Sequence, residues 1–71
     1  MSFEPKMFGE RFRELRVEKG LTTVQVGEAV GISDASVSRW ENGLIIPKAD
    51  SIYSVAKFFG VSADYLLGLE D

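Results

Sequence analysis

The 71-residue chain contains no cysteine and no histidine, and this double absence removes several classes of protein. Without cysteine no disulfide can brace so short a chain, and without either residue a Cys/His zinc site is excluded. No stretch approaches the roughly 18 apolar residues of a membrane-spanning helix, and residues 1–6 lack the apolar core of a secretion signal. We therefore expect a cytoplasmic protein that holds no metal or cofactor and folds by packing apolar side chains.

The charge balance is the main argument against a nucleic-acid partner. Eight basic and eleven acidic residues give a formal net charge of −3, whereas the neutralisation of phosphates supplies much of the affinity of DNA-binding proteins. The acidic excess lies mostly near the C-terminus, because residues 44–71 hold two basic and four acidic side chains, whereas residues 1–20 hold five and four. The net charge therefore does not decide what one face of the protein can bind.

Apolar residues recur at three- and four-residue steps in five short segments, which is the spacing of one helix face. The chain has only two prolines and no alternating apolar pattern, so a sheet is disfavoured. Capping hydroxyls and glycines bound these segments, and Thr22 precedes Gln25 at the spacing of a capping box. The predicted fold class is all-α, one domain over residues 1–71 that forms a compact bundle of five short helices. The predicted helices cover residues 7–19, 23–30, 34–41, 49–59 and 63–67.

The first of these helices has a clear inner face. Phe8, Phe12 and Leu15 recur on one side together with Arg16. The other charged residues of this segment, Arg11 among them, fall mostly on the remaining sides.

Residues 23–42 carry the most specific pattern. A three- or four-residue turn at Gly31, Ile32 and Ser33 joins two short helices. It is too short for antiparallel packing, so the helices must cross steeply. Gly27 supplies the small residue needed where the backbones meet, and Gly31 tolerates the positive φ of the turn. The apolar residues that fill the space between these helices and the rest of the domain are Val26, Val30, Ile32, Val37 and Trp40. This is the helix-turn-helix pattern, whose second helix enters the major groove of DNA.

The sequence resembles the lambda-repressor-like family, with a Cro/Xre-type helix-turn-helix, over residues 8–68. The stretches that carry the resemblance are FGERFRELR (8–16), KGLT (19–22), GIS (31–33), VSRWENG (37–43), IPKAD (46–50) and FGVSADYLL (59–67). The resemblance implies a bacterial or phage transcription regulator, expected to be a repressor, that binds a palindromic operator in double-stranded DNA as a homodimer.

The residues expected to meet DNA follow from the inward direction of Val37 and Trp40. Arg39 can donate two hydrogen bonds to guanine, Asp34 can accept one from cytosine, and Ala35 can touch a thymine methyl group. The alternative is a solvated helix face that makes no contact with bases. For Asp34 alone, a further alternative is that its carboxylate repels phosphates at wrong sites. The N-termini of the helices at residues 23–30 and 34–41, and the segment that follows residue 41, should contact the phosphate backbone. The complete set of predicted DNA-binding residues is Thr22, Thr23, Ser33, Asp34, Ala35, Ser36, Ser38, Arg39, Asn42, Gly43 and Lys48.

The resemblance also implies a structural role for Arg16 and Glu41, because the matching arginine and glutamate of the family form a pair. A bidentate pair would fix the recognition helix to the first helix; the alternative is a surface pair of little energy. Three residues depart from the family pattern. Thr23 replaces a glutamine, Gly27 an alanine and Leu44 a basic residue, which together predict fewer phosphate contacts and weaker binding.

Two rival functions remain open at this stage. A protein-binding module on the same fold, such as an antitoxin-like or antirepressor partner, fits the acidic balance and the short side chains of residues 34–41. An enzyme is disfavoured, because the chain has no histidine, cysteine or glycine-rich phosphate loop. The sequence also gives no sign of a pocket for a small-molecule effector. The apolar run at residues 44–46 either completes the core or forms part of a dimer patch with Phe58 and the fifth helix. Val24 is apolar where its helix pattern expects a polar residue.

Overall fold

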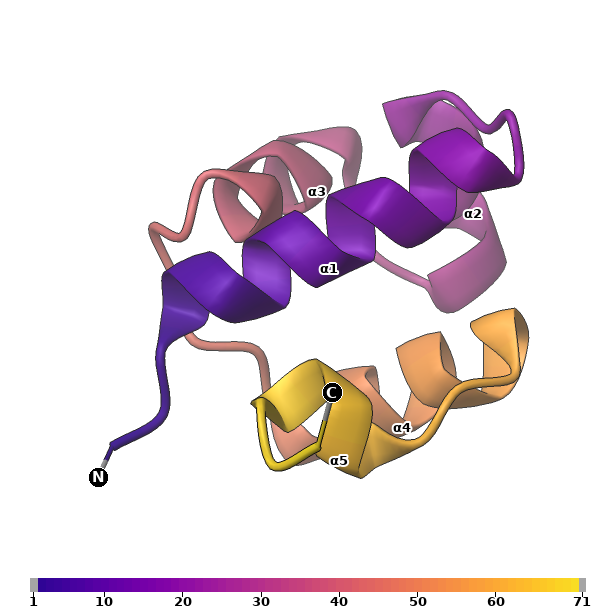
Figure 1. Ribbon diagram of the computed structural model, residues 1–71. Helices are drawn as coiled ribbons and strands as arrows, with labels where there is room; N and C mark the ends of the chain where they lie inside the picture. Colours follow the sequence, from indigo (N-terminus) through magenta and orange to yellow (C-terminus); the bar gives the residue numbers. More distant parts are fainter. Residues whose placement is uncertain (1, 71) are drawn as a thin grey trace.

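The computed structural model describes residues 2–70, and within them it contains five helices and no strand (Figure 1). The helices are α1 (Pro5–Glu18), α2 (Thr23–Val30), α3 (Asp34–Glu41), α4 (Ala49–Phe59) and α5 (Ala63–Leu67). The predicted all-α, five-helix class is confirmed, and the bounds of α2 to α5 are those expected. The start of the first helix was predicted wrongly, at residue 7 instead of Pro5. Proline is tolerated in the first turn because the N–H group that it lacks would have no helical partner there.

Side-chain hydroxyls begin three of the helices, as the sequence predicts. The Thr22 hydroxyl accepts a hydrogen bond from the Gln25 amide, and the Gln25 side chain accepts one from the Thr22 amide, so the capping box is present. Ser33 and Ser62 accept from the amides three residues later. The glycine that follows α2, Gly31, has a φ of 81°, in the left-handed region that the sharp turn to α3 requires.

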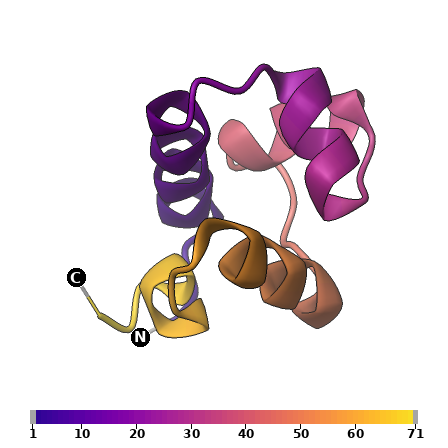
Figure 2. The same ribbon diagram turned by 90° about the vertical axis from the view of Figure 1, so that its right-hand side faces the viewer.

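The five helices pack around one core. α3 packs on both α1 and α2, while α4 packs against α2 and α5, and α5 returns to α1. Figure 1 shows α1 running across the α2–α3 pair, with α4 and α5 lying beneath it. Figure 2 shows the same arrangement from the side, with the orange and yellow helices closing one end of the bundle. Within residues 2–70 no helix is both long and apolar enough to cross a membrane.

Aromatic rings at the centre of the core join α1 to α3. Phe8 and Phe12 stack with their centroids 6.0 Å apart, and the edge of Trp40 meets them at 5.6 Å and 5.3 Å. Such edge-to-face contacts stabilise a core beyond the area that they bury. The fully or almost fully buried apolar residues are Phe8, Phe12, Val26, Val30, Val37, Trp40, Val55 and Leu66.

Two helical glycines let backbones approach closely. A β-carbon at Gly9 would clash with the carbonyl oxygen of Trp40 and would lie 3.0 Å from that of Glu41, so α1 and the end of α3 meet backbone to backbone. A β-carbon at Gly27 would lie 2.7 Å from the carbonyl oxygen of Ile32. The expected close approach at Gly27 is therefore present, although the neighbouring atom belongs to the turn. The close approach at Gly9 was not predicted, because its one signal in the sequence is a glycine inside a helix.

Candidate nucleic-acid interface

One side of α3 is anchored in the core, and the other side is open. Val37 and Trp40 are buried, whereas Asp34, Ser38 and Arg39 are exposed. Of the predicted DNA-binding residues, the exposed ones are Thr22, Ser33, Asp34, Ala35, Ser38, Arg39, Asn42 and Lys48, and the half-buried ones are Thr23, Ser36 and Gly43. The structure thus brings a row of small polar side chains and one arginine to the open face of α3.

An ion pair fixes the end of α3 to the end of α1. Arg16 Nε donates to Glu41 Oε2 at 2.6 Å and Arg16 Nη2 donates to Glu41 Oε1 at 3.0 Å, which is the bidentate geometry expected from the resemblance. Arg16 Nη1 also donates to the Leu21 carbonyl oxygen at 2.9 Å. The hydrogen bond to Glu41 raises the pKa of Arg16 above its ordinary value, while burial opposes this and charge attraction adds to it. Both side chains are mostly buried, so this pair positions the open face rather than forming part of it.

The chain leaves α3 through a tight hydrogen-bonded turn. The Gly43 amide donates to the Trp40 carbonyl at 3.1 Å, and the Leu44 amide donates to the Arg39 carbonyl at 2.9 Å, the two bonds of a Schellman motif. Asn42 Nδ2 donates to the Ser38 carbonyl at 2.8 Å. The amide of Gly43 and the side-chain NH₂ group of Asn42 therefore already serve to end the helix, although sequence reasoning placed both residues at DNA.

Among the described residues, the start of α2 keeps two backbone N–H groups without a hydrogen-bond partner, and the start of α3 keeps three. The capping box of α2 engages the amides of Thr22 and Gln25, which leaves those of Thr23 and Val24. At α3, the Ser33 hydroxyl accepts from the Ser36 amide at 3.1 Å and donates to the Ser36 hydroxyl at 3.0 Å. These two helix starts can therefore present amides to an anion.

Half of the basic side chains already have partners within the fold. Arg11 donates to the carbonyls of Tyr65 and Glu70 and lies 4.4 Å from the Tyr65 ring centroid. The other three are Arg16 on Glu41, Lys19 over the Phe58 ring and Lys57 over the Tyr53 ring. Among residues 2–70, the basic residues for which no such partner is found are Lys6, Arg13, Arg39 and Lys48.

The apolar run after α3 divides between core and surface. Ile45 packs against the core, whereas Leu44 is 71% exposed and Ile46 is 70% exposed. The expectation that this run completes the core therefore holds for Ile45 and is wrong for its two neighbours, which lie on either side of a bend at Ile45 and face solvent. Val24 is also half exposed, and nothing in the structure explains an apolar residue at that position.

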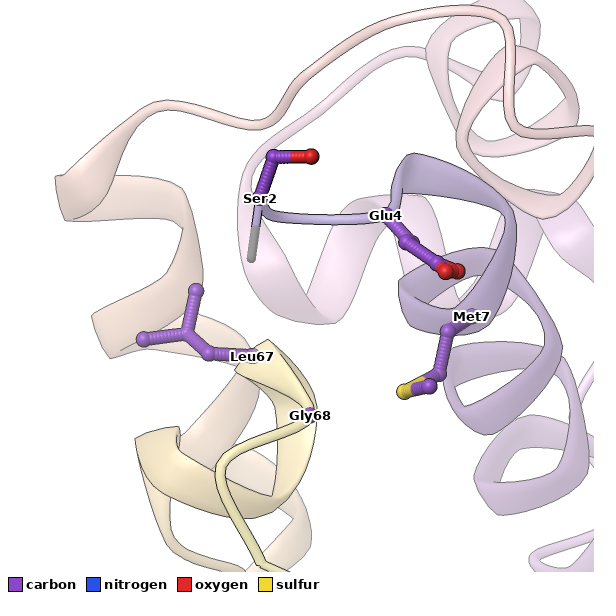
Figure 3. A pocket seen from close by; sticks show the side chains of 5 residues that line it. All are labelled: Ser2, Glu4, Met7, Leu67 and Gly68. Atoms are coloured by element: carbon purple, nitrogen blue, oxygen red, sulfur yellow. The ribbon is translucent and has the colours of Figure 1, made fainter.

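A shallow hollow of about 340 Å³ lies apart from α2 and α3 (Figure 3). Met7 of α1 faces it from one side and the Leu67–Gly68 end of α5 from the other, with Ser2 and Glu4 of the N-terminal segment beside them. Within residues 2–70 no three acidic side chains gather as metal ligands would. None of the predicted DNA-binding residues lines this hollow.

A family model described as helix-turn-helix matches residues 12–66. The chain belongs to this family of lambda-repressor-like transcription regulators. The transcriptional activator BcrR of Enterococcus faecalis is 38% identical over 64 residues, which cover 90% of this chain and 31% of that protein. The cryptic phage CTXphi repressor RstR of Vibrio cholerae is 34% identical over 55 residues, covering 78% of this chain and 50% of that protein. The chain thus spans about a third to a half of the length of these curated relatives.

A solved structure of the phage P22 c2 repressor bound to a synthetic operator has the same fold. It superposes with a TM-score of 0.83 at 30% identity, covering 89% of this chain and 96% of that one. The predicted family and fold are therefore confirmed, and the family consists of transcription regulators rather than enzymes. The named relatives include both an activator and a repressor, so family membership alone does not fix the sign of regulation.

Proposed function

We propose that this protein regulates transcription by binding an operator in double-stranded DNA as a homodimer, with α3 in the major groove. The observation that carries the proposal is the contrast between the two sides of α3. One side is held by Trp40 in the core and by the Arg16–Glu41 pair, while the other presents exposed polar side chains with nothing packed on them. A rigidly held helix with an open polar face is what reading base edges requires.

The base-reading residues in this proposal lie along the open face of α3. Arg39 reads guanine through two hydrogen bonds, Asp34 accepts from cytosine and Ala35 contacts a thymine methyl group. Ser38 stands between Ala35 and Arg39 on the same exposed face and contributes a hydroxyl. Because these side chains are short except for Arg39, we expect this arginine to dominate the preference for one sequence over another.

Contacts with the phosphate backbone position α3 in the groove. The first-turn amides of α2 at Thr23 and of α3 at Asp34 donate to phosphates, together with the hydroxyls of Thr22 and Ser36. Ser33 contributes its backbone amide, because its hydroxyl proton already goes to Ser36. Lys48, exposed at the start of α4, supplies a charge contact. Asn42 and Gly43 contribute less, because their donors already close the end of α3. With half of the cations engaged within the fold, few ions are released on binding and the salt dependence is shallow.

A second copy is needed because one α3 reads only half of an operator. Two copies related by a two-fold axis would place their α3 helices roughly 34 Å apart, one turn of the duplex. The molecule measures 32 × 24 × 20 Å, which is small enough for two copies to stand side by side at that spacing. We expect repression, through occupation of a site that the transcription machinery also needs.

Titrations of labelled duplex, followed by fluorescence anisotropy at several salt concentrations, test this function. Arg39→Ala should weaken binding to a preferred duplex much more than to a mixed-sequence one. Lys48→Ala should weaken both equally and reduce the salt slope by about one. Arg13→Ala, which removes an exposed cation of α1, is the control and should change neither. Absence of binding to every duplex at low salt would overturn the proposal.

That negative result would favour the rival function of a protein-binding module. The observation in its favour is electrostatic: the formal charge is −3, and Asp34 offsets Arg39 on the open face of α3. In that case the same face would bind a basic protein surface, and Arg39→Ala would strengthen rather than weaken the interaction.

A further inference from the structure

We propose that Asn42 is a site of spontaneous deamidation, which the folded end of α3 keeps closed and whose products bind DNA weakly. Asn42 is the only asparagine of the chain, and a glycine follows it. Because glycine has no side chain to hinder its own amide nitrogen, Asn–Gly is the dipeptide in which that nitrogen attacks the asparagine side chain most readily. The covalent step is independent of the function proposed above, whereas its effect on DNA binding rests on that function.

The reaction needs water and no other partner. The Gly43 amide nitrogen loses its proton and forms a bond to Cγ of Asn42, and the bond from Cγ to Nδ2 breaks. The side-chain nitrogen takes up a proton and leaves as ammonia, which closes a five-membered succinimide ring. Water then opens the ring at either of its two C–N bonds. One opening gives aspartate, and the other gives isoaspartate, in which the main chain runs through Cβ.

Three features of the fold keep the reacting atoms apart. The Gly43 amide, which supplies the attacking nitrogen, donates to the Trp40 carbonyl at 3.1 Å. Asn42 Nδ2 donates to the Ser38 carbonyl at 2.8 Å, which holds the side chain back along α3. The ψ angle of Asn42 is 3°, so the Gly43 nitrogen eclipses the backbone nitrogen of Asn42 and not its Cβ. Ring closure requires the nitrogen on the Cβ side, so ψ must rotate and both hydrogen bonds must break first.

Deamidation therefore requires the end of α3 to open. Asn42 is exposed at the end of its helix, where local opening costs less than global unfolding. The preceding residue, Glu41, is held to α1 by Arg16. This ion pair restrains the end of α3, so its removal should open the site more often. The fraction of molecules that are open at any time then sets the rate in the folded protein.

Neither product can rebuild the end of α3 as it was. Aspartate at position 42 has no donor for the Ser38 carbonyl and places a negative charge at the C-terminal end of a helix, where the dipole disfavours it. Isoaspartate lengthens the main chain by one carbon beside Gly43, which packs on the start of α1 (Figure 1): a β-carbon at Gly43 would lie 2.9 Å from Lys6 Cα. Both products also add a negative charge beside the face proposed to meet phosphates.

The first test measures the deamidation rate of the intact chain at neutral pH. The readouts are the gain in mass when NH₂ is replaced by OH and the labelling of isoaspartate by a methyltransferase. The chain unfolded in guanidinium chloride should react at least about 10-fold faster than the folded chain, because folding closes the site. Asn42→Gln is the matched control, since its longer side chain closes a six-membered ring far more slowly, and it should gain no mass under either condition.

A second comparison opens the site without denaturant. Arg16→Ala should raise the rate of the folded chain at least about fivefold, because Glu41 is then no longer held to α1. Arg13→Ala removes an exposed arginine from the same helix and should leave the rate within about twofold of wild type.

The effect on DNA is measured on an aged sample of wild type, from which ion exchange separates the deamidated molecules from the unmodified ones. The deamidated fraction should bind a mixed-sequence duplex at low salt at least about 10-fold more weakly than the unmodified fraction. After the same incubation, Asn42→Gln should keep the affinity of its own fresh sample.

The outcomes separate this inference from the proposed function. Equal rates in the folded and unfolded chain, or an unchanged rate in Arg16→Ala, would overturn the closed site. A deamidated fraction that binds as tightly as the unmodified one would overturn the effect on DNA. If fresh wild type binds no duplex, the proposed function fails and the effect on DNA fails with it, while the ratio of the folded and unfolded rates still decides whether the fold closes the site.

Discussion

Replacing Arg16 with alanine removes three hydrogen bonds in one step and leaves the Glu41 carboxylate, whose side chain is 9% exposed, without its partner. Hydrogen bonds to charged groups contribute about 1.5–3 kcal/mol, whereas an exposed ion pair contributes under about 1 kcal/mol. Because the pair is mostly buried and bidentate, we expect Arg16→Ala to lower the free energy of unfolding by about 2–3 kcal/mol.

That loss is large for a chain of this length. A domain of 71 residues has a total stability of about 4–10 kcal/mol, and each kcal/mol corresponds to about 4–8 °C in Tm. We therefore expect Tm to fall by about 8–24 °C. Urea and thermal unfolding can both be followed through Trp40, the only tryptophan, which is 3% exposed in the fold.

The matched control is Arg13→Ala, an exposed arginine on the same helix, which should change stability by less than about 0.5 kcal/mol. Glu41→Ala completes a double-mutant cycle, in which we expect a coupling energy above about 1.5 kcal/mol. A loss at Arg16 no larger than that at Arg13, or losses at Arg16 and Glu41 that simply add, would show that the pair does not hold α3 on α1.

Two further stability predictions follow from local geometry. Gly9→Ala should cost about 3 kcal/mol or more, because its β-carbon would meet the backbone carbonyl of Trp40, which cannot move without shifting α3. Glu10→Ala, at the exposed neighbouring position, should cost under about 0.5 kcal/mol in the same urea titration, and equal costs would refute the close approach. Thr22→Ala should remove about 1 kcal/mol by breaking the capping box, while Thr22→Ser should retain most of the stability. An unchanged urea midpoint for Thr22→Ala would mean that the cap is not used in solution.

The helices were predictable because local signals bound them. Thr22, Ser33 and Ser62 each accept the capping hydrogen bond that their spacing predicts, and the left-handed glycines end the helices where expected. The inner face of α1 was also predictable, since Phe8 and Phe12 recur at helical spacing and are buried. The start of α1 was missed because Pro5 was not recognised as a first-turn residue.

The features that sequence reasoning missed depend on contacts between distant segments. Arg11 lies on the charged side of α1, yet it stacks on Tyr65 and binds carbonyls near the C-terminus, which no local spacing reveals. Spacing likewise cannot tell that Gly9 faces the backbone of α3. In the run after α3, composition alone does not distinguish the packed Ile45 from the exposed Leu44 and Ile46.

The outward direction of Arg39 is the point on which the proposed DNA-reading role of α3 depends. Selection of bound sequences from a random duplex library, performed in parallel with wild type and Arg39→Ala, tests it most directly. Wild type should enrich a two-fold motif whose half-sites lie about 10 base pairs apart from centre to centre. Arg39→Ala should bind that motif about 5- to 150-fold more weakly, equivalent to about 1–3 kcal/mol, and should lose preference at one base pair in each half-site. Enrichment of the same motif with the same affinity by the variant, or no enriched motif for wild type, would contradict the role of α3 as the element that reads DNA.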